Sequence, residues 1–275
     1  MARSSRLWIA ALALTVVAAG WQRRSGPSYP YRAEVAVGGA AMAVSLPRSN
    51  PTTSSARVAV PAPRACVGGT LYWRCFRSDG PFAALPLRPE GGELAAALPD
   101  LPPAGKVEYF VELTDGAEPV RIPPKAGETV ILRYLGPVPA VVLIPHIAVM
   151  FVAMLVGVRA GLAAAFNAPE RRTLAVITLA ALTLGGLILG PITQKYAFGA
   201  FWTGVPFGWD LTDNKTLLMW MGWAVAGVAV VRRWRAARWL VVLATVLMVA
   251  VYLVPHSVRG SELDCTRLPP ATRLP

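Results

Sequence analysis

The two histidines of this chain are the residues with the most distinctive chemistry, because the sequence contains no others. His146 and His256 each follow a proline, and each lies on or just after a long apolar run. Between them, residues 193–215 form an aromatic, glycine-rich segment that is too polar for hydrocarbon. A neutral imidazole is a good axial ligand for haem iron, and two imidazoles from facing helices can hold a porphyrin between them. We therefore expect His146 and His256 to be metal ligands of a haem; the alternatives are an interhelical hydrogen bond for His146 and an ordinary interfacial position for His256.

A porphyrin also needs flat apolar walls and cationic partners for its propionates. The segment 193–215 carries six aromatic residues that can supply the walls: Tyr196, Phe198, Phe201, Trp202, Phe207 and Trp209. Lys195 and Lys215 are candidate propionate partners, and the glycines at 199, 204 and 208 indicate a backbone that packs closely against something flat. The alternative is an aromatic belt at the lipid headgroups, with Asp213 or Thr212 capping the following helix.

The composition indicates a membrane protein. Of 275 residues, 55% are hydrophobic and only 15% are charged, and the mean hydropathy is +0.48. The net charge of +12 comes largely from arginines at the ends of apolar runs, as in Arg171–Arg172 and the stretch 232–238. Such placement is typical of residues that set membrane topology, and it argues against nucleic acid as a partner.

The apolar runs that must position the histidines lie at 137–158, 173–192, 216–231 and 239–254. Each is roughly long enough to cross about 30 Å of hydrocarbon as a helix. Because basic connections face the cytoplasm, we expect four transmembrane helices over 137–258 in the inner (cytoplasmic) membrane. The loop 193–215, both histidines and the tail 259–275 then lie on the external, periplasmic side.

The N-terminal half has two parts. Residues 1–21 read as a signal peptide or a signal anchor, and both remain open. Residues 22–136 contain short alternating runs with turn signals, which favours an exported all-β sandwich of the immunoglobulin or fibronectin type III kind. We expect this domain to be a spacer or a docking module. Cys66 and Cys75 could form a local disulfide there, and the role of Cys265 in the tail is open.

The loop and its flanking histidines resemble the haem-handling membrane proteins of cytochrome c maturation, whose signature is an external loop of the form WGxYWxWDxKE between external histidines. Residues 198–202, which end in Phe201 and Trp202, are similar to the first half of this signature, and Trp209 with Asp210 to the second. Phe198 stands at the leading tryptophan, and six residues separate the halves. The resemblance covers 137–258 and implies that these residues, with the histidines, form a haem b site.

Three functions follow from these residues. The first is a membrane protein that presents or handles haem b at the outer face, as in cytochrome c assembly, with the β-domain docking a protein client. The second is a membrane-anchored interaction or assembly subunit that has no cofactor and packs its loop on a partner. The third is a b-type cytochrome that transfers electrons. Whether the protein is an enzyme is left undecided by the sequence.

Overall fold

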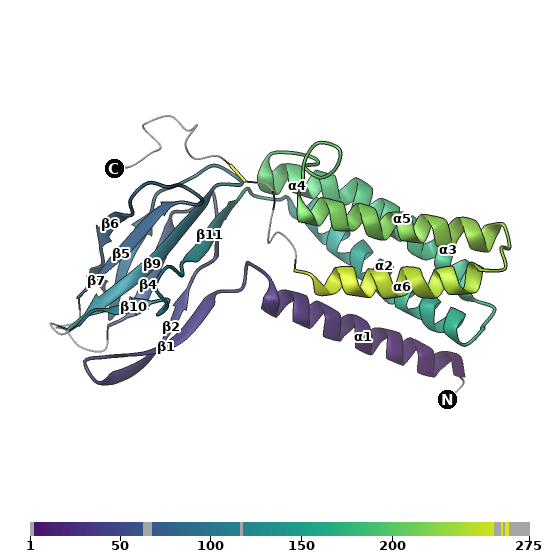
Figure 1. The fold of residues 1–275 in the computed structure, drawn as a ribbon, viewed down its shortest axis with the longest axis horizontal. Coiled ribbons are helices and arrows are strands. Elements are labelled where there is room, and N and C mark those ends of the chain that lie inside the picture. Colours follow the sequence, from purple (N-terminus) through teal and green to yellow (C-terminus); the bar gives the residue numbers. More distant parts are fainter. Residues whose placement is uncertain (1–2, 63–67, 116–117, 256–259, 261, 264–275) are drawn as a thin grey trace. The chain divides into compact units, whose positions relative to one another are not determined.

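A computed structural model of the chain describes residues 3–62, 68–115, 118–255, 260 and 262–263. The chain divides into two compact units (Figure 1). The helical unit comprises residues 1–26 and 138–261, and the β-sheet unit comprises residues 27–137 and 262–275. Cys66, Cys265 and His256 lie outside the described residues, so the expected disulfide and the second haem ligand stay predictions.

The helical unit contains seven helical elements in its described part. They are α1 (Arg3–Ser25), α2 (Ala140–Ala165), α3 (Arg171–Leu182), the π-helix η1 (Thr183–Leu189), α4 (Gly190–Phe198), α5 (Leu211–Val231) and α6 (Ala237–Leu253). The elements α3, η1 and α4 continue as one helical rod over Arg171–Phe198.

Four of the described helical segments are long and apolar enough to cross a membrane: Ser4–Ser25, Ala140–Ala165, Arg171–Phe198 and Leu211–Val231. This confirms the prediction of a multi-span helical domain and indicates membrane association. The run expected at 239–254 forms α6, which is apolar but has only 17 residues. The N-terminal segment is instead one of the four long helices.

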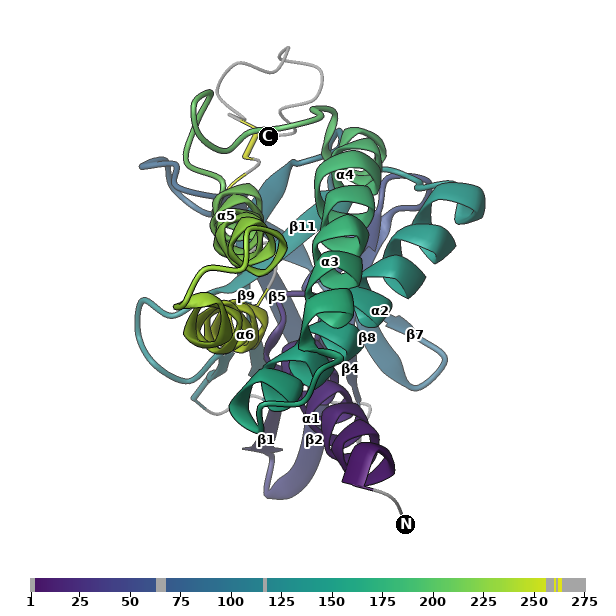
Figure 2. The same cartoon turned by 90° about the vertical axis from the view of Figure 1, so that its right-hand side faces the viewer.

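Helices α2, α3, α5 and α6 form a ring in which each packs against two neighbours, and α1 packs against α2 and α6 (Figure 2). Small residues allow the closest approach. Gly157 and Gly161 are spaced four apart on α2, and a Cβ added to Gly161 would lie 2.4 Å from Thr245 Oγ1 on α6. Thr245 Oγ1 donates to the Gly157 carbonyl at 3.1 Å. This is the close packing that small residues four apart permit between membrane helices.

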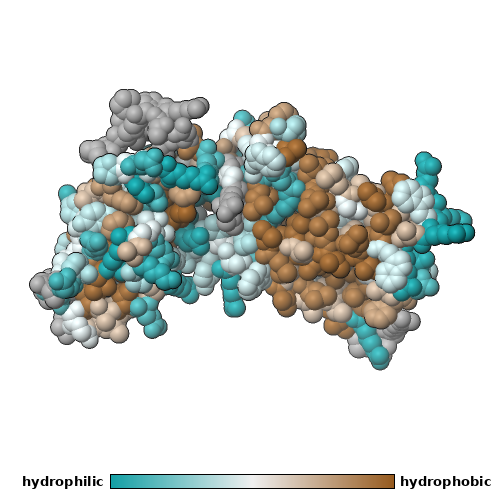
Figure 3. All heavy atoms as spheres, in the orientation of Figure 1, coloured by the Kyte–Doolittle hydropathy of each residue, from teal (hydrophilic) through white to brown (hydrophobic). Residues whose placement is uncertain are grey.

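The helical unit has two chemically different ends, separated by a broad hydrophobic surface (Figure 3). At one end, which we call the basic end, Arg159 Nη2 donates to Ser4 Oγ and to Glu170 Oε1, each at 3.2 Å. Arg159 is buried, and its Nε and Nη1 have no hydrogen-bond partner among the described residues. At the other end, Trp21 Nε1 donates to the Leu253 carbonyl at 3.1 Å. These contacts place the start of α1 at the basic end and its finish at the opposite end.

The β-sheet unit contains eleven described strands in three sheets. The strands are β1 (Tyr31–Val37), β2 (Ala40–Leu46), β3 (Ser49–Pro51), β4 (Ala56–Pro61), β5 (Gly68–Cys75), β6 (Ala83–Pro86), β7 (Arg88–Glu90), β8 (Glu93–Leu98), β9 (Lys106–Thr114), β10 (Val120–Ile122) and β11 (Val130–Leu135). The first sheet is the β1-β2 hairpin, the second has the order β3-β11-β9-β5-β6 with β10 beside β9, and the third has the order β4-β8-β7.

One hydrophobic core draws buried side chains from all three sheets, among them Met42, Leu46, Val58, Leu94, Leu71 and Val111. The alternation of buried and exposed residues on β2 and β4 explains why their period-two pattern was readable in the sequence. The predicted β-sheet-rich portion is therefore confirmed.

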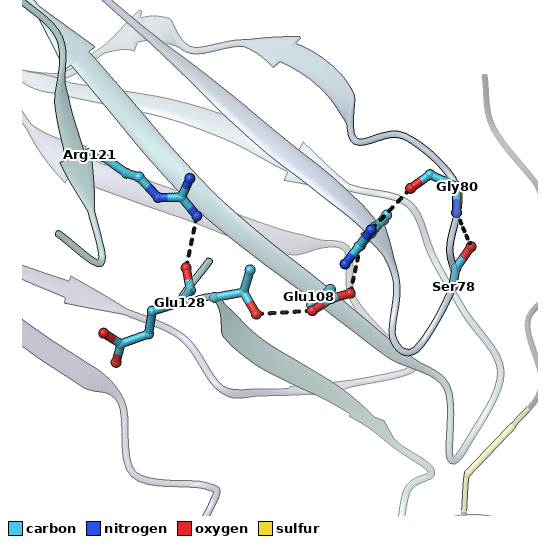
Figure 4. A network of polar contacts seen from close by, with 7 residues as sticks. Ser78, Gly80, Glu108, Arg121 and Glu128 are labelled. Atoms are coloured by element: carbon cyan, nitrogen blue, oxygen red, sulfur yellow. Dashed lines mark hydrogen bonds and ion pairs between the residues drawn. The ribbon is translucent and has the colours of Figure 1, made fainter. Parts of the chain in front are cut away.

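A polar network lies on the large sheet of this unit (Figure 4). Glu108 on β9 accepts from Arg74 Nε at 2.6 Å and from Thr129 Oγ1 at 3.0 Å. Arg74 also donates to the Gly80 carbonyl at 3.1 Å, and its guanidinium carbon lies 4.3 Å from the centre of the Phe82 ring. These contacts join β5, β9 and the loop after β5, so we assign them to stabilising the sheet.

Candidate functional site

His146 lies on α2, one residue after a proline inside the helix, and is half-buried. Its Nδ1 lies 3.0 Å from the backbone oxygen of Gly185 in η1. Because a carbonyl oxygen can only accept, Nδ1 carries the proton and the lone pair of the neutral ring is on Nε2. Within the described residues no hydrogen bond to Nε2 is formed. Metal-ligating histidines are commonly oriented in this way, by a hydrogen bond from the other ring nitrogen to a carbonyl.

The partner of His146 is a π-helical turn, and the local sequence explains the turn. Pro191 in the first turn of α4 has no N–H to donate to the preceding turn, which interrupts the α-helical ladder. The Gly190 N–H donates to the Gly185 carbonyl oxygen, which also accepts the hydrogen bond from His146 Nδ1. A Cβ added to Gly185 would lie 2.8 Å from Met150 Sδ, so glycine is needed for α2 to approach η1. Single π-helical turns frequently occur at functional sites.

The predicted loop 193–215 is helical at both ends. α4 extends to Phe198 and ends at Gly199, which has a φ of 86°, and α5 begins at Leu211 with Asp210 as its N-cap. The irregular part is therefore residues 199–210, which we call the aromatic loop. Gln194 and Lys195 lie on the last turns of α4, and Lys215 lies at the start of α5.

A buried carboxylate fixes the first part of the aromatic loop. Asp213 is 4% exposed, and its Oδ2 accepts four hydrogen bonds. Two come from the backbone N–H groups of Thr203 at 2.6 Å and Gly204 at 2.9 Å. The others come from Thr203 Oγ1 at 3.3 Å and Gln194 Nε2 at 3.0 Å. A carboxylate that accepts this many bonds holds its donors in one geometry.

The same loop displays its aromatic rings. Phe201 is 57% exposed, Phe207 is 82% exposed and Trp209 is 85% exposed. Trp202 is half-buried, and its Nε1 donates to the Val205 carbonyl at 3.0 Å within the loop. Exposed aromatic residues gathered on an ordered loop are typical of a binding surface.

The polar residues at the base of the loop differ in their availability. Lys195 is exposed, and its Nζ donates to the Gly199 carbonyl at 2.7 Å. Lys215 is 7% exposed, and its Nζ donates to the Val254 carbonyl. Lys195 is thus the more accessible of the two predicted propionate partners. Asp210 is buried and caps α5 by accepting from the Thr212 N–H at 2.7 Å.

Two described residues near the end of the helical unit, Val254 and Gly260, contact the base of this loop. Val254 accepts from Lys215, and Gly260 lies so close to Asp210 that an added Cβ would be 2.3 Å from Asp210 Oδ2. The described residues on either side of His256 therefore both contact residues that begin α5.

His146 lies at the level of the start of α4 and not at the level of the aromatic loop. Its Cε1 is 3.7 Å from the position of a Cβ added to Gly190, the first residue of α4. The nine residues of α4 separate this level from the aromatic loop by about 12 Å along the helix. Among the described residues, no group of three or more His, Cys, Asp or Glu side chains could hold a metal ion.

Sequence reasoning missed the roles of Asp213, Gln194 and the glycines of η1. The signal for Asp213 was present, since an acidic residue at the start of a helix can accept backbone N–H groups. Its acceptance from Thr203, ten residues earlier, has no signal in the sequence. No family model and no curated protein matches this chain, so the site is interpreted from its own residues.

Proposed function

We propose that this protein binds haem b near the outer face of the inner membrane and presents or handles it, in a role similar to cytochrome c assembly. The observation that carries the proposal is the His146 ring, oriented by Gly185 with Nε2 left for iron. In this proposal His146 and His256 would hold the haem iron, and Lys195 would pair with a propionate. Bound haem would supply the redox-active iron and the planar porphyrin that is handled.

The residues at the site fit such a group. The imidazole of His146 is half-buried beside a glycine-rich helical turn, which offers an apolar surface with little side-chain bulk. The exposed Phe201 and Trp209 are ordered on the loop above it. About 12 Å of helix separates His146 from the loop, so His146 would hold the iron and the loop rings would supply apolar walls.

The distribution of basic residues supports the membrane orientation that the proposal requires. The connections 166–170 and 232–236 and the start of α1 share the basic end, where the arginines gather. Basic connections face the cytoplasm, so the aromatic loop would face the periplasm. The β-sheet unit joins the chain between the end of α1 and the start of α2, and we propose that it is an exported immunoglobulin- or fibronectin-III-like sandwich that docks a client.

The visible spectrum of the purified protein tests the proposal. After expression with ample haem, we expect a Soret band in the wild type and its loss or shift in His146→Ala and in His256→Ala. Met150→Leu, one turn along α2 from His146, is the matched control and should keep the band. A wild-type protein without a Soret band would overturn haem binding, and a band unchanged by both histidine substitutions would overturn the ligand assignment.

A second candidate function is favoured by the exposure of the loop rings. Phe207 and Trp209 are 82% and 85% exposed, as expected for anchors that fill pockets on a partner protein. In this alternative the protein is an assembly subunit without a cofactor. Cross-linking from residue 207 in native membranes to one defined protein, in a preparation that lacks a Soret band, would support it over haem handling.

A further inference from the structure

A groove opens on the helical unit at its basic end, between the first turns of α3 and the last turn of α5. It has a volume of about 550 Å³. Its lining residues are Pro169, Arg172, Thr173, Val176, Ile177, Val230 and Val231. The groove lies at the end of the bundle opposite to the aromatic loop, because α3 begins and α5 ends there.

The walls of the groove are apolar, although no other part of the described chain covers them. Val176 is 46% exposed, Ile177 is 43% exposed and Val231 is 62% exposed. All three belong to helical segments that are long and apolar enough to cross a membrane. Within such a segment, exposed valine and isoleucine side chains contact hydrocarbon, so the groove has the lining that an acyl chain requires.

The mouth of the groove is cationic. Arg172 Nε donates to the Val230 carbonyl on α5 at 3.2 Å, which holds the guanidinium across the space between the two helices. Arg232 follows Val231 directly at the C-cap of α5 and is exposed. In the described part of the chain, no carboxylate forms an ion pair with Arg172 or Arg232. The nearby Glu170 is bonded to Arg159 at 3.2 Å instead.

We propose that this groove binds an anionic phospholipid of the facing leaflet, with one acyl chain against Val176, Ile177 and Val231 and the phosphate at Arg172. An arginine offers its terminal N–H groups to phosphate oxygens in a paired geometry. The Nε bond to Val230 leaves both terminal nitrogens for this purpose. Basic pockets between membrane helices on the cytoplasmic side are suited to anionic headgroups.

A lipid fits the groove better than a free anion does. A phosphate ion would use only the arginine end and would leave the valine and isoleucine walls uncovered. A neutral phospholipid would fill the walls but would place its own cation beside Arg172. The combination of apolar walls and a guanidinium that forms no ion pair with a described carboxylate therefore selects an acyl chain that carries a net negative headgroup.

Native mass spectrometry of the full chain tests this proposal. The protein is released from a mild detergent after equilibration with phosphatidylglycerol and phosphatidylcholine of equal chain length. We expect a retained phosphatidylglycerol adduct in the wild type and a roughly fivefold weaker adduct in Arg172→Gln. Ile177→Trp fills the groove without changing the charge and should also weaken the adduct. Arg235→Gln is the control, since Arg235 is exposed at the same end but does not line the groove.

Each other outcome overturns the proposal. Equal retention of both lipids would show that the groove does not prefer an anionic headgroup. If Arg235→Gln weakens the adduct as much as Arg172→Gln, the lipid is held by the general positive charge of the basic end and not by Arg172. If inorganic phosphate displaces the adduct and Ile177→Trp has no effect, the site is a phosphate site only. The Soret measurement is independent of these variants, so failure here is distinguishable from failure of haem binding.

Discussion

The two ends of the helical unit distribute polar and apolar side chains in opposite ways. At the loop end, Asp210, Asp213 and Lys215 are each less than 8% exposed, while Phe207 and Trp209 stand in the open. At the basic end, Arg232 and Arg235 are exposed at the helix termini, as is usual where a membrane helix meets water. Apart from the buried Arg159, the basic end therefore follows the ordinary rule for membrane proteins, and the loop end inverts it.

The exposure of the loop rings has a consequence for what orders the loop. A loop whose aromatic residues do not form a core needs internal hydrogen bonds to keep one conformation. Hydrophobic burial cannot order the aromatic loop if its largest rings are exposed, so buried carboxylates supply the order instead. The basic end has another source of order, the close packing of α2 on α6 through Gly157 and Gly161. The two ends should therefore respond to different substitutions.

The largest effect is expected for Asp213→Ala. It leaves the N–H groups of Thr203 and Gly204 without their acceptor, and we expect a loss of about 3 kcal/mol in the free energy of unfolding. Denaturant unfolding of the detergent-solubilised protein measures this loss, and limited proteolysis should show new cleavage within residues 199–210. Asn214→Ala is the control, because the Asn214 Oδ1 accepts a single bond, from the Val205 N–H at 2.7 Å.

If Asp213→Ala and Asn214→Ala are equally stable and equally resistant to protease, the loop is ordered by something other than the carboxylate. The contrast between the two ends would then fail at the loop end.

A smaller effect, about 2 kcal/mol, is expected for Gly161→Leu. The added side chain would meet Thr245 on α6, whose atoms lie 2.4 to 2.6 Å from an added Cβ. We expect a lower unfolding midpoint with an intact protease pattern at 199–210, since the aromatic loop is at the other end. Gly20→Leu on α1 is the matched control, because no atom lies within 4 Å of its added Cβ. A Gly161→Leu protein as stable as Gly20→Leu would show that α2 and α6 do not pack closely.

The sequence was sufficient for the features that depend on periodicity and composition. Long apolar runs predicted the helices near 140–165 and 211–231, since helix length in a membrane is set by hydrocarbon thickness. Period-two alternation predicted strands such as β2 and β4. The run at 239–254 was already at the short end for a membrane span, and α6 has 17 residues, as that run indicated.

The candidate site was less predictable, because its contacts join residues far apart in the chain to backbone atoms. For His146 the sequence offered an interhelical hydrogen bond as the alternative to haem ligation, and the structure shows such a bond. Nothing in the sequence identified the Gly185 carbonyl, 39 residues away, as the partner. The role of Asp213 was also hidden, since the sequence suggested a helix cap and the structure shows an acceptor for Thr203 and Gly204. The sequence gives the type of each side chain. It does not show which of the many backbone carbonyl and N–H groups will lie beside that side chain, because only folding brings them together.

The smallest effect on stability, and the sharpest on function, is expected for Phe207→Ser and Trp209→Ser. Both rings are more than 80% exposed, so each change should alter the free energy of unfolding by less than about 0.5 kcal/mol. Because exposed rings on an ordered loop cost little entropy to bind, we expect each variant to weaken binding about tenfold or more. Haem titration of the purified variants, followed by the Soret band, measures this loss. Unchanged haem affinity in both variants would assign the rings to a protein partner and leave His146 alone to carry the haem proposal.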